Sequence, residues 1–114
     1  EGIALNVDGD RAAAAIATAV QADALVLLTG ANGLYRAFPD PKSRIPEASI
    51  SDYDELERYA EGRMKRKVLS ARDAIQGGVP EVMIGAAAAE RPVHAALQGA
   101  GTVLRAARTA EAVQ

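Results

Sequence analysis

The stretch ALVLLTGANG, residues 24–33, decides how this chain is expected to fold. Residues 24–29 form a continuously apolar run closed by Thr29, as expected of a parallel strand that is covered on both faces. Residues 30–33 then form a cluster of turn-forming residues. Glycine lets a backbone approach a phosphate or a base closely, although such a cluster is more often only a turn. The cluster matches neither a Walker motif nor the dinucleotide fingerprint.

Upstream of this strand, an amide and two carboxylates stand at the head of an alanine-rich segment: Asn6, Asp8 and Asp10. Residues 3–6 are predicted to end a strand, and Asp8 is predicted to cap a helix over residues 9–21. The inward face of that helix would carry apolar residues at helical spacing, namely Ala13, Ile16, Ala17 and Val20. The two acids can simply cap the helix and complement its dipole, or they can serve a ligand at its N-terminus.

Downstream of the strand, helical and strand-like segments alternate. Residues 38–46 are expected to form a loop that can hold a short edge strand. Helices are predicted over residues 52–59, capped by Ser51, over 63–76 and over 91–99, and strands over 81–87 and 101–105. The alternation indicates an α/β domain with a largely parallel sheet, whose ligands bind beyond the carboxyl ends of the strands. Here those ends are residues 6–10, 29–33 and 85–88.

The helix over residues 63–76 carries the densest basic run of the chain, GRMKRKVL. Its apolar stripe consists of Met64, Val68, Ala71 and Ile75. At 100° per residue, Lys65 and Arg66 point away from that stripe, whereas Lys67 borders it beside Arg63 and can face a cleft. A lysine there can neutralise a phosphoryl group. The alternatives are a solvated helix face, which is the more frequent case, and a small nucleic-acid patch.

Composition narrows the function classes. The chain has 114 residues, 49% of them apolar and 4% aromatic, so one domain with a core of aliphatic side chains is expected. There is no cysteine, which suits the cytoplasm and excludes disulfides and cysteine-ligated metal sites. A formal net charge of −2 argues against non-specific binding to nucleic acid or membranes. No run is long enough to span a membrane. The only histidine, His94, is interpreted as a surface or packing residue.

Three segments together resemble the amino acid kinase family: NVDGDRAAAAIA, LVLLTGANGLY and EGRMKRKVLSARDAIQGGV occur in that family's order and spacing. ALQGAGTVLR is similar to its closing Gly-Thr strand. The resemblance implies a three-layer αβα sandwich with a mainly parallel sheet, as in carbamate kinase. It identifies residues 1–105 as a C-terminal nucleotide-binding lobe, followed by a tail over residues 106–114. The N-terminal substrate lobe with its Lys-x-Gly-Gly loop is not in this sequence, and we interpret the chain as part of a longer protein.

The branch of the family is indicated by two short motifs. The resemblance is to the acetylglutamate-kinase-like enzymes of lysine biosynthesis, and it lies in the motifs Gly62-Arg63-Met64 and Asp8-Gly9-Asp10. Those enzymes phosphorylate the side-chain carboxylate of 2-aminoadipate, which is attached to an acidic amino-group carrier protein. In some relatives the substrate on the carrier is glutamate. Arg63, Lys65 and Arg66 can help such an acidic partner to dock. The resemblance further implies a cytoplasmic enzyme that is a homo-oligomer when complete.

The resemblance also implies roles for individual residues. Asp10 and Lys67 would be catalytic, with Asp10 holding the lysine and Lys67 binding the phosphates of ATP. Asn6 and Arg63 would contact the substrate, no residue would bind a metal directly, and Mg²⁺ would accompany ATP. The nucleotide would be lined by two groups of residues: Thr29, Gly30, Ala31, Asn32, Gly33 and Leu34, and Tyr59, Ala60, Glu61 and Met64. Many relatives have aspartate where this chain has Gly30, so a side-chain contact to the nucleotide is lost there or replaced by the backbone.

Two alternatives stay open. The enzyme can be an acetylglutamate kinase of arginine biosynthesis, or the chain can be a regulatory, nucleotide-binding module without catalysis. The presence of both Asp10 and Lys67 argues against the second, because a pure binder has no need of the pair. A substrate carboxylate is already a nucleophile, so a kinase of this kind needs no catalytic base.

Overall fold

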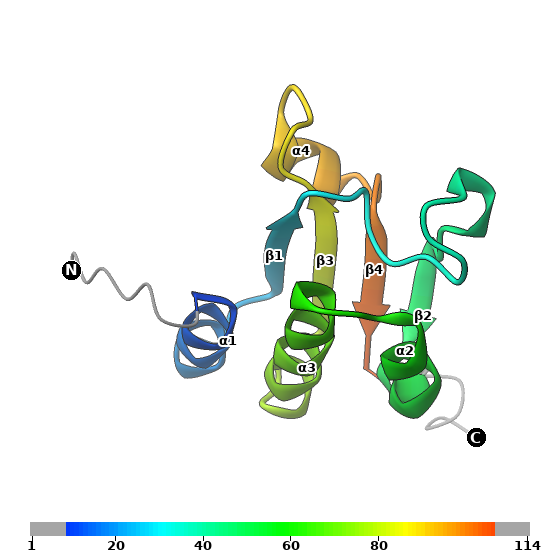
Figure 1. The fold of residues 1–114 in the computed structure, drawn as a ribbon. Coiled ribbons are helices and arrows are strands. Elements are labelled where there is room, and N and C mark those ends of the chain that lie inside the picture. The colour runs from blue at the N-terminus through cyan, green and yellow to red at the C-terminus, as the bar shows by residue number, and fades with distance from the viewer. Residues whose placement is uncertain (1–8, 107–114) are drawn as a thin grey trace, which may run out of the picture.

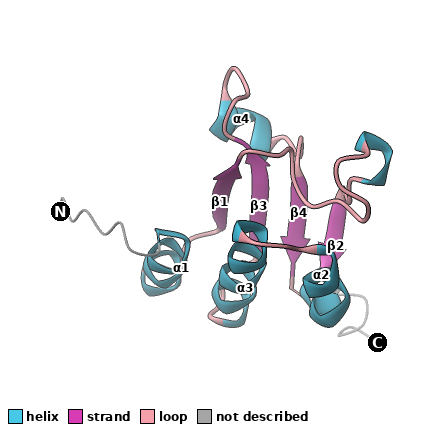
Figure 2. Ribbon diagram, in the orientation of Figure 1, coloured by secondary structure: helices cyan, strands magenta, loops and turns pink. Residues whose placement is uncertain are grey.

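The computed structural model describes residues 9–106 (Figures 1 and 2). Asn6 and Asp8, and the tail beyond Ala106, lie outside the described residues. The helices are α1 (Gly9–Ala19), α2 (Tyr53–Tyr59), α3 (Arg63–Gln76) and α4 (Pro92–Leu97), and the strands are β1 (Ala24–Thr29), β2 (Glu47–Ser49), β3 (Glu81–Ala86) and β4 (Thr102–Arg105). Short 3₁₀ turns lie at Pro41–Ser43 and Ile50–Asp52. None of the helices within residues 9–106 is long and apolar enough to cross a membrane.

The strands form one sheet in the order β1-β3-β4-β2. β1 pairs with β3 and β2 with β4 in parallel, whereas β3 and β4 are antiparallel. The prediction of a mainly parallel sheet is therefore confirmed, with one antiparallel pairing at its centre. The carboxyl ends of β1 and β3 consequently lie at the same edge of the sheet, the upper edge in Figure 1.

The sheet lies between two layers of helices. On one face, α1 and α3 pack against Leu27, Val82, Ile84 and Leu104, which alternate along their strands with residues of the other face. On that other face, Ala96 of α4 packs against Met83 and Val103. The three-layer arrangement predicted from the family resemblance is therefore confirmed.

The predicted inward face of the first helix is confirmed for Ala13 and Ala17, which pack against the core, and is wrong for Ile16 and Val20. α1 ends at Ala19, its buried residues are Ala14 and Ala17, and Ile16 and Val20 are 60% and 66% exposed. The helix packs against α3 through its small side chains because the two helices approach closely. A Cβ on Gly77 at the end of α3 would come within 2.6 Å of the Thr18 side chain. Large apolar side chains do not fit this contact, so they lie on the opposite side.

The predicted cap of the second helix is also wrong. Ser49, not Ser51, provides a capping side chain, and it accepts a hydrogen bond from the backbone N–H of Ser51. This cap precedes the 3₁₀ turn at Ile50–Asp52, and α2 itself begins at Tyr53 without a side-chain cap. The predicted cap, Ser51, therefore lies two residues after the observed one. The helix α2 contacts α3 through Tyr53, whose ring centroid lies 4.5 Å from the Arg72 guanidinium. Burial of the Tyr53 side chain, together with the negative charge of Glu57, raises the pKa of Tyr53.

Candidate functional site

Asp10 and Lys67 meet between the N-terminal turns of α1 and α3. The Lys67 Nζ atom donates to both carboxylate oxygens of Asp10, at 3.1 and 3.0 Å. The Lys67 side chain is 12% exposed and that of Asp10 is 24% exposed. Partial exclusion of water strengthens such a pair and holds the ammonium in one position, in contrast to a mobile surface lysine. The predicted convergence of these two residues, which are 57 positions apart in sequence, is confirmed.

A cavity within residues 9–106 has a volume of about 650 Å³, which is ordinary for a small-molecule site. It lies between the loop after β1, the segment that continues from this loop, the end of α2 and the start of α3. Eight of the residues predicted to contact nucleotide or substrate line it: Thr29, Ala31, Gly33, Leu34, Tyr59, Glu61, Arg63 and Met64. The structure therefore brings together both predicted nucleotide segments.

Three predicted lining residues lie elsewhere. Gly30 and Asn32 are exposed and are not among the described residues that line the cavity. Ala60 is 2% exposed and belongs to the core between the helices and the sheet. Within residues 29–33, the members that line the cavity alternate with members that do not. The prediction that Gly30, Asn32 and Ala60 line the nucleotide cavity is therefore wrong.

The sequence reasoning missed one wall of the cavity. Residues 35–44 form a hairpin arm, in which Tyr35 and Arg44 pair and the Arg36 N–H donates to the Ser43 carbonyl at 2.9 Å. The cavity is lined in addition by Tyr35, Arg36, Ala37, Phe38 and, from α2, Arg58. Tyr35 and Phe38 stack edge to face, with ring centroids 5.4 Å apart. The aromatic and basic residues of LYRAF, directly after the glycine cluster, were the available signal.

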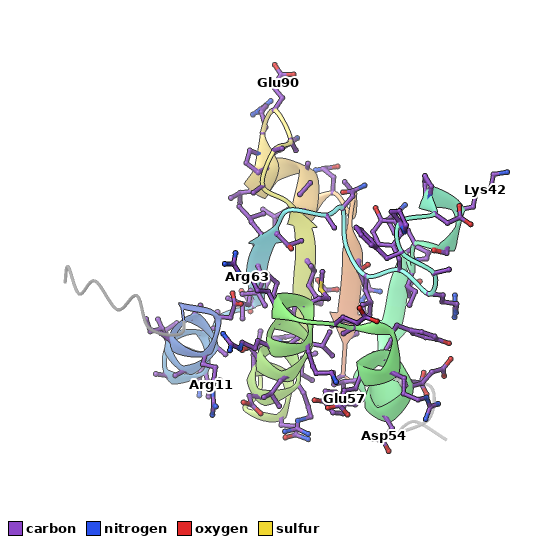
Figure 3. The ribbon with its side chains drawn as sticks, viewed as in Figure 1. Arg11, Lys42, Asp54, Glu57, Arg63 and Glu90 are labelled. Atoms are coloured by element: carbon purple, nitrogen blue, oxygen red, sulfur yellow. The ribbon has the colours of Figure 1, made fainter. Side chains whose placement is uncertain are left out.

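The wall of the cavity is basic at several points. The charged residues that line it are three arginines, Arg36, Arg58 and Arg63, and one acid, Glu61. Arg63 is the first residue of α3 (Figure 3), and Met64 follows it in the wall. Lys67 lies three residues further along the same helix, about one turn from the cavity. The cavity and the Asp10–Lys67 pair thus both lie at the N-terminal end of α3.

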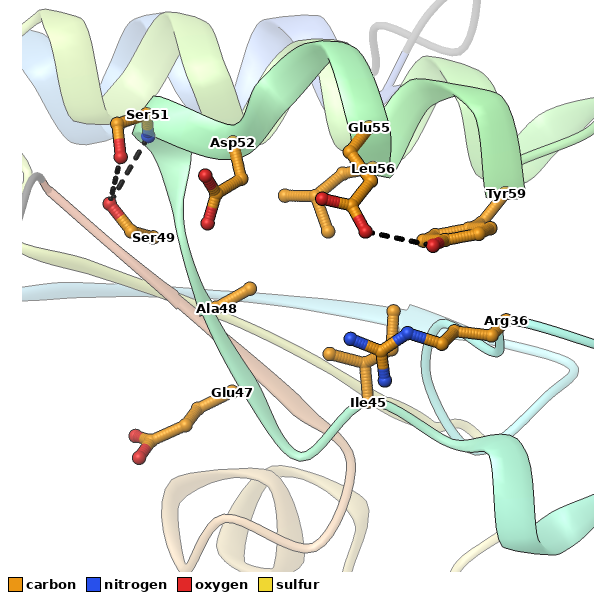
Figure 4. Close-up of a pocket in the computed structure, with 10 residues that line it drawn as sticks. All are labelled: Arg36, Ile45, Glu47, Ala48, Ser49, Ser51, Asp52, Glu55, Leu56 and Tyr59. Atoms are coloured by element: carbon orange, nitrogen blue, oxygen red, sulfur yellow. Dashed lines mark hydrogen bonds between the residues drawn. The ribbon is translucent and has the colours of Figure 1, made fainter.

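A second cavity of about 240 Å³ adjoins the first (Figure 4). It lies between β2 and α2, where Tyr59 donates to Glu55 at 2.8 Å. Arg36 and Tyr59 line both cavities, and the Arg36 guanidinium lies 5.8 Å from the Tyr59 ring centroid. These two side chains therefore form the partition between the cavities.

Residues 9–106 contain no group of three or more histidine, cysteine or acidic side chains that could hold a metal ion. This composition fits a Mg²⁺ ion that arrives on the phosphates of a nucleotide and keeps most of its water, since such an ion needs one or two protein carboxylates at most. His94 lies exposed on α4.

Comparison with known proteins agrees with this arrangement. The model of the amino acid kinase family matches residues 1–86. A [LysW]-aminoadipate kinase of Deinococcus radiodurans is 50% identical over 104 residues, which is 91% of this chain and 36% of that enzyme. An acetylglutamate kinase of Cutibacterium acnes is 45% identical over 84 residues, covering 73% of this chain and 27% of that enzyme. The chain thus spans about a third of the length of the curated relatives it matches.

Among solved structures, a carbamate kinase from Giardia lamblia bound to AMP-PNP superposes with a TM-score of 0.73 at 24% identity. The match covers 94% of this chain and 38% of that one. At this identity the likeness concerns the fold alone, and it extends over nearly the whole chain.

Proposed function

The chain belongs to the amino acid kinase family, and on this premise we propose that it is the ATP-binding part of a carboxylate kinase. The proposed acceptor is the side-chain carboxylate of 2-aminoadipate or glutamate attached to a carrier protein, and the product is an acyl phosphate. The name of the Deinococcus relative, a [LysW]-aminoadipate kinase, supports this acceptor. The enzyme is proposed to work in the cytoplasm and, when complete, as a homo-oligomer.

The ion pair of Asp10 and Lys67 is the observation that carries the proposal. Transfer of a phosphoryl group to a carboxylate needs no base, because the attacking oxygen is already ionised. The protein must instead hold positive charge where negative charge spreads over the transferred group. Lys67 is suited to this role because Asp10 holds its ammonium at 3.0–3.1 Å from both carboxylate oxygens without covering it completely. Asp10 acts in this proposal as a positioning residue and does not attack the phosphorus.

The 650 Å³ cavity is proposed to hold ATP, with Mg²⁺ on its phosphates. Its two ends differ in chemistry. The rings of Tyr35, Phe38 and Tyr59 suit a purine base, whereas Arg63, which lies about one helical turn before Lys67 on α3, suits the phosphates. This orientation directs the terminal phosphate towards the ion pair. Asn6, outside the described residues, and Arg63 are proposed to contact the acceptor.

The carrier protein is proposed to dock beside this site. Arg63, Lys65 and Arg66 are exposed at the start of α3. A cationic surface next to the phosphoryl-transfer site suits an acidic carrier, because complementary charge accelerates the encounter and orients the partner.

Two alternative functions can be distinguished from the proposed one by the substrates that the enzyme accepts. An acetylglutamate kinase, which the Cutibacterium relative favours, would accept free acetylglutamate, whereas the proposed enzyme requires the carrier-bound substrate. Acyl-phosphate formation, trapped as hydroxamate, separates them when both substrates are offered to the intact enzyme that carries this chain. A regulatory nucleotide-binding module would use neither substrate.

Replacement of Lys67 tests the catalytic role. In Lys67→Ala, kcat of the intact enzyme should fall at least about a hundredfold, as when another preorganised charge-stabilising group is removed. The matched control is Lys65→Ala, which removes an exposed lysine from the same helix and should leave kcat with saturating substrates unchanged. Loss of ATP affinity with kcat preserved in Lys67→Ala would refute the catalytic role of Lys67 and leave it a role in nucleotide binding alone.

A further inference from the structure

Thr102, the first residue of β4, connects two segments that are distant in sequence. It is fully buried, and its hydroxyl donates to the Ile45 carbonyl at 2.6 Å while accepting from the Leu34 N–H at 2.9 Å. Leu34 and Ile45 are the residues that flank the hairpin arm on either side, and the Ile45 N–H donates to the Leu34 carbonyl at 2.8 Å. One hydroxyl group therefore joins both ends of the arm to the central sheet.

The loop after β1 is pressed directly against this hydroxyl. Gly33 has a φ of +124°, and a Cβ at this residue would lie 2.6 Å from the Thr102 Oγ1 atom. Only glycine fits both this backbone conformation and this approach. Gly33 and Leu34 line the large cavity, as do four residues of the hairpin arm. Thr102 is thus in contact with the cavity wall without being part of it.

The start of β4 is itself held in place. Gly101 precedes Thr102, and a Cβ on Gly101 would overlap the Ile84 carbonyl of β3. The Gly101 carbonyl accepts a hydrogen bond from the Arg44 guanidinium at the end of the arm. A hydroxyl on such a constrained strand can define the position of the loop and the arm relative to β3 and α3.

We propose that Thr102 is a positioning residue of the nucleotide site. Its hydroxyl holds the loop after β1 and the hairpin arm at the separation from α2 and α3 that the nucleotide requires. The inference rests on the proposed function, because it takes the ligand of the cavity to be ATP. A purely structural threonine would contribute to stability only, so the test must measure ligand affinity apart from stability.

Three variants make this separation. Thr102→Val keeps the branched shape and removes the hydroxyl, whereas Thr102→Ser keeps the hydroxyl. Val103→Ala is the matched control, because Val103 lies next in the same strand but packs on the opposite face with Met83 and Ala96. The measurements are ATP–Mg²⁺ affinity of the 114-residue chain by calorimetry, hydrogen exchange of the Leu34 amide, and the midpoint of thermal unfolding.

In Thr102→Val, ATP affinity should fall about tenfold and the Leu34 amide should exchange faster, since a buried N–H and a buried C=O lose their partner. Thr102→Ser should retain both properties. Val103→Ala should lower the unfolding midpoint without changing ATP affinity. If Thr102→Val does not fold, Gly33→Ala replaces it, since its Cβ forces the loop off the hydroxyl from the other side.

Each other outcome is decisive. Unchanged ATP affinity in Thr102→Val, or in Gly33→Ala, overturns the inference and leaves the proposed function intact. An equal loss of affinity in Val103→Ala also overturns it, because general destabilisation would then suffice. Failure of the unsubstituted chain to bind ATP overturns the proposed function, and this inference with it.

Discussion

At the scale of single residues, three consecutive cations of α3 lie in two different environments. Lys67 is mostly shielded and paired with Asp10, whereas Lys65 and Arg66 are exposed. A helical rotation of 100° per residue is sufficient to separate a charge that borders the packed face from two that face water. The paired lysine is available for chemistry within the site, and the exposed cations are available for a macromolecular partner.

Reversal of the two exposed charges tests this division. In the intact enzyme carrying Lys65→Glu and Arg66→Glu, the KM for the carrier-bound substrate should rise about tenfold at low salt, because the docking attraction becomes repulsion. The KM for ATP should not change. The control variant carries Lys42→Glu and Arg91→Glu, which change the net charge by the same amount at two other exposed residues. Lys42 lies well away from α3 (Figure 3). An unchanged carrier KM, measured by steady-state kinetics at two salt concentrations, would contradict the docking proposal.

At the scale of elements, close packing of α1 on α3 brings Asp10 to Lys67. The contact ends at Thr18 and Gly77, where a Cβ on the glycine would meet the threonine side chain at 2.6 Å. Gly77→Ala should therefore lower the free energy of unfolding by about 1–3 kcal/mol, the usual cost of overpacking. Thr18→Ala removes the two side-chain atoms at 2.6 Å and leaves only the Cβ atom at 3.2 Å, so the same glycine substitution should cost clearly less in that background. Urea unfolding of the four proteins of this cycle measures the coupling; equal losses in both backgrounds would show that the helices are not in close contact there.

At the scale of the whole molecule, the 114-residue chain is expected to bind ATP without catalysing phosphoryl transfer. The cavity proposed to hold ATP lies in this chain, and the chain spans only 36% of the Deinococcus relative. The Lys-x-Gly-Gly phosphate loop that the family resemblance implies is not in the sequence. The 114-residue chain is therefore predicted to bind ATP but to form no measurable acyl phosphate, because positioning of both substrates supplies most of the catalysis. Hydroxamate formed above background by the purified chain would refute this prediction.

Local patterns in the sequence were sufficient for the main elements. The bounds of β1 and α3 agree with the prediction at both ends, since a continuous apolar run and a helical stripe closed by two glycines are strong local signals. The α/β class followed from their alternation. Local patterns did not reveal which side chains of α1 are exposed or which residue provides the cap before α2. Burial of α1 depends on how closely α3 approaches, and the cap depends on a 3₁₀ turn that precedes the helix.

The sequence by itself determined which residues could carry charge and where glycine would permit a close approach. Hydrophobic period and helix geometry depend only on near neighbours along the chain, so these local signals mark Asp10, Lys67 and the loop over residues 29–33 as candidates. The resemblance to the amino acid kinase family then implied their roles. The tertiary structure alone decided that Lys67 lies 3.0 Å from Asp10, that the hairpin arm closes one side of the cavity and that Thr102 anchors it. These contacts join residues 57 to 68 positions apart. Only the packing of helices on a sheet and the pairing of β4 with β3 fix such distances.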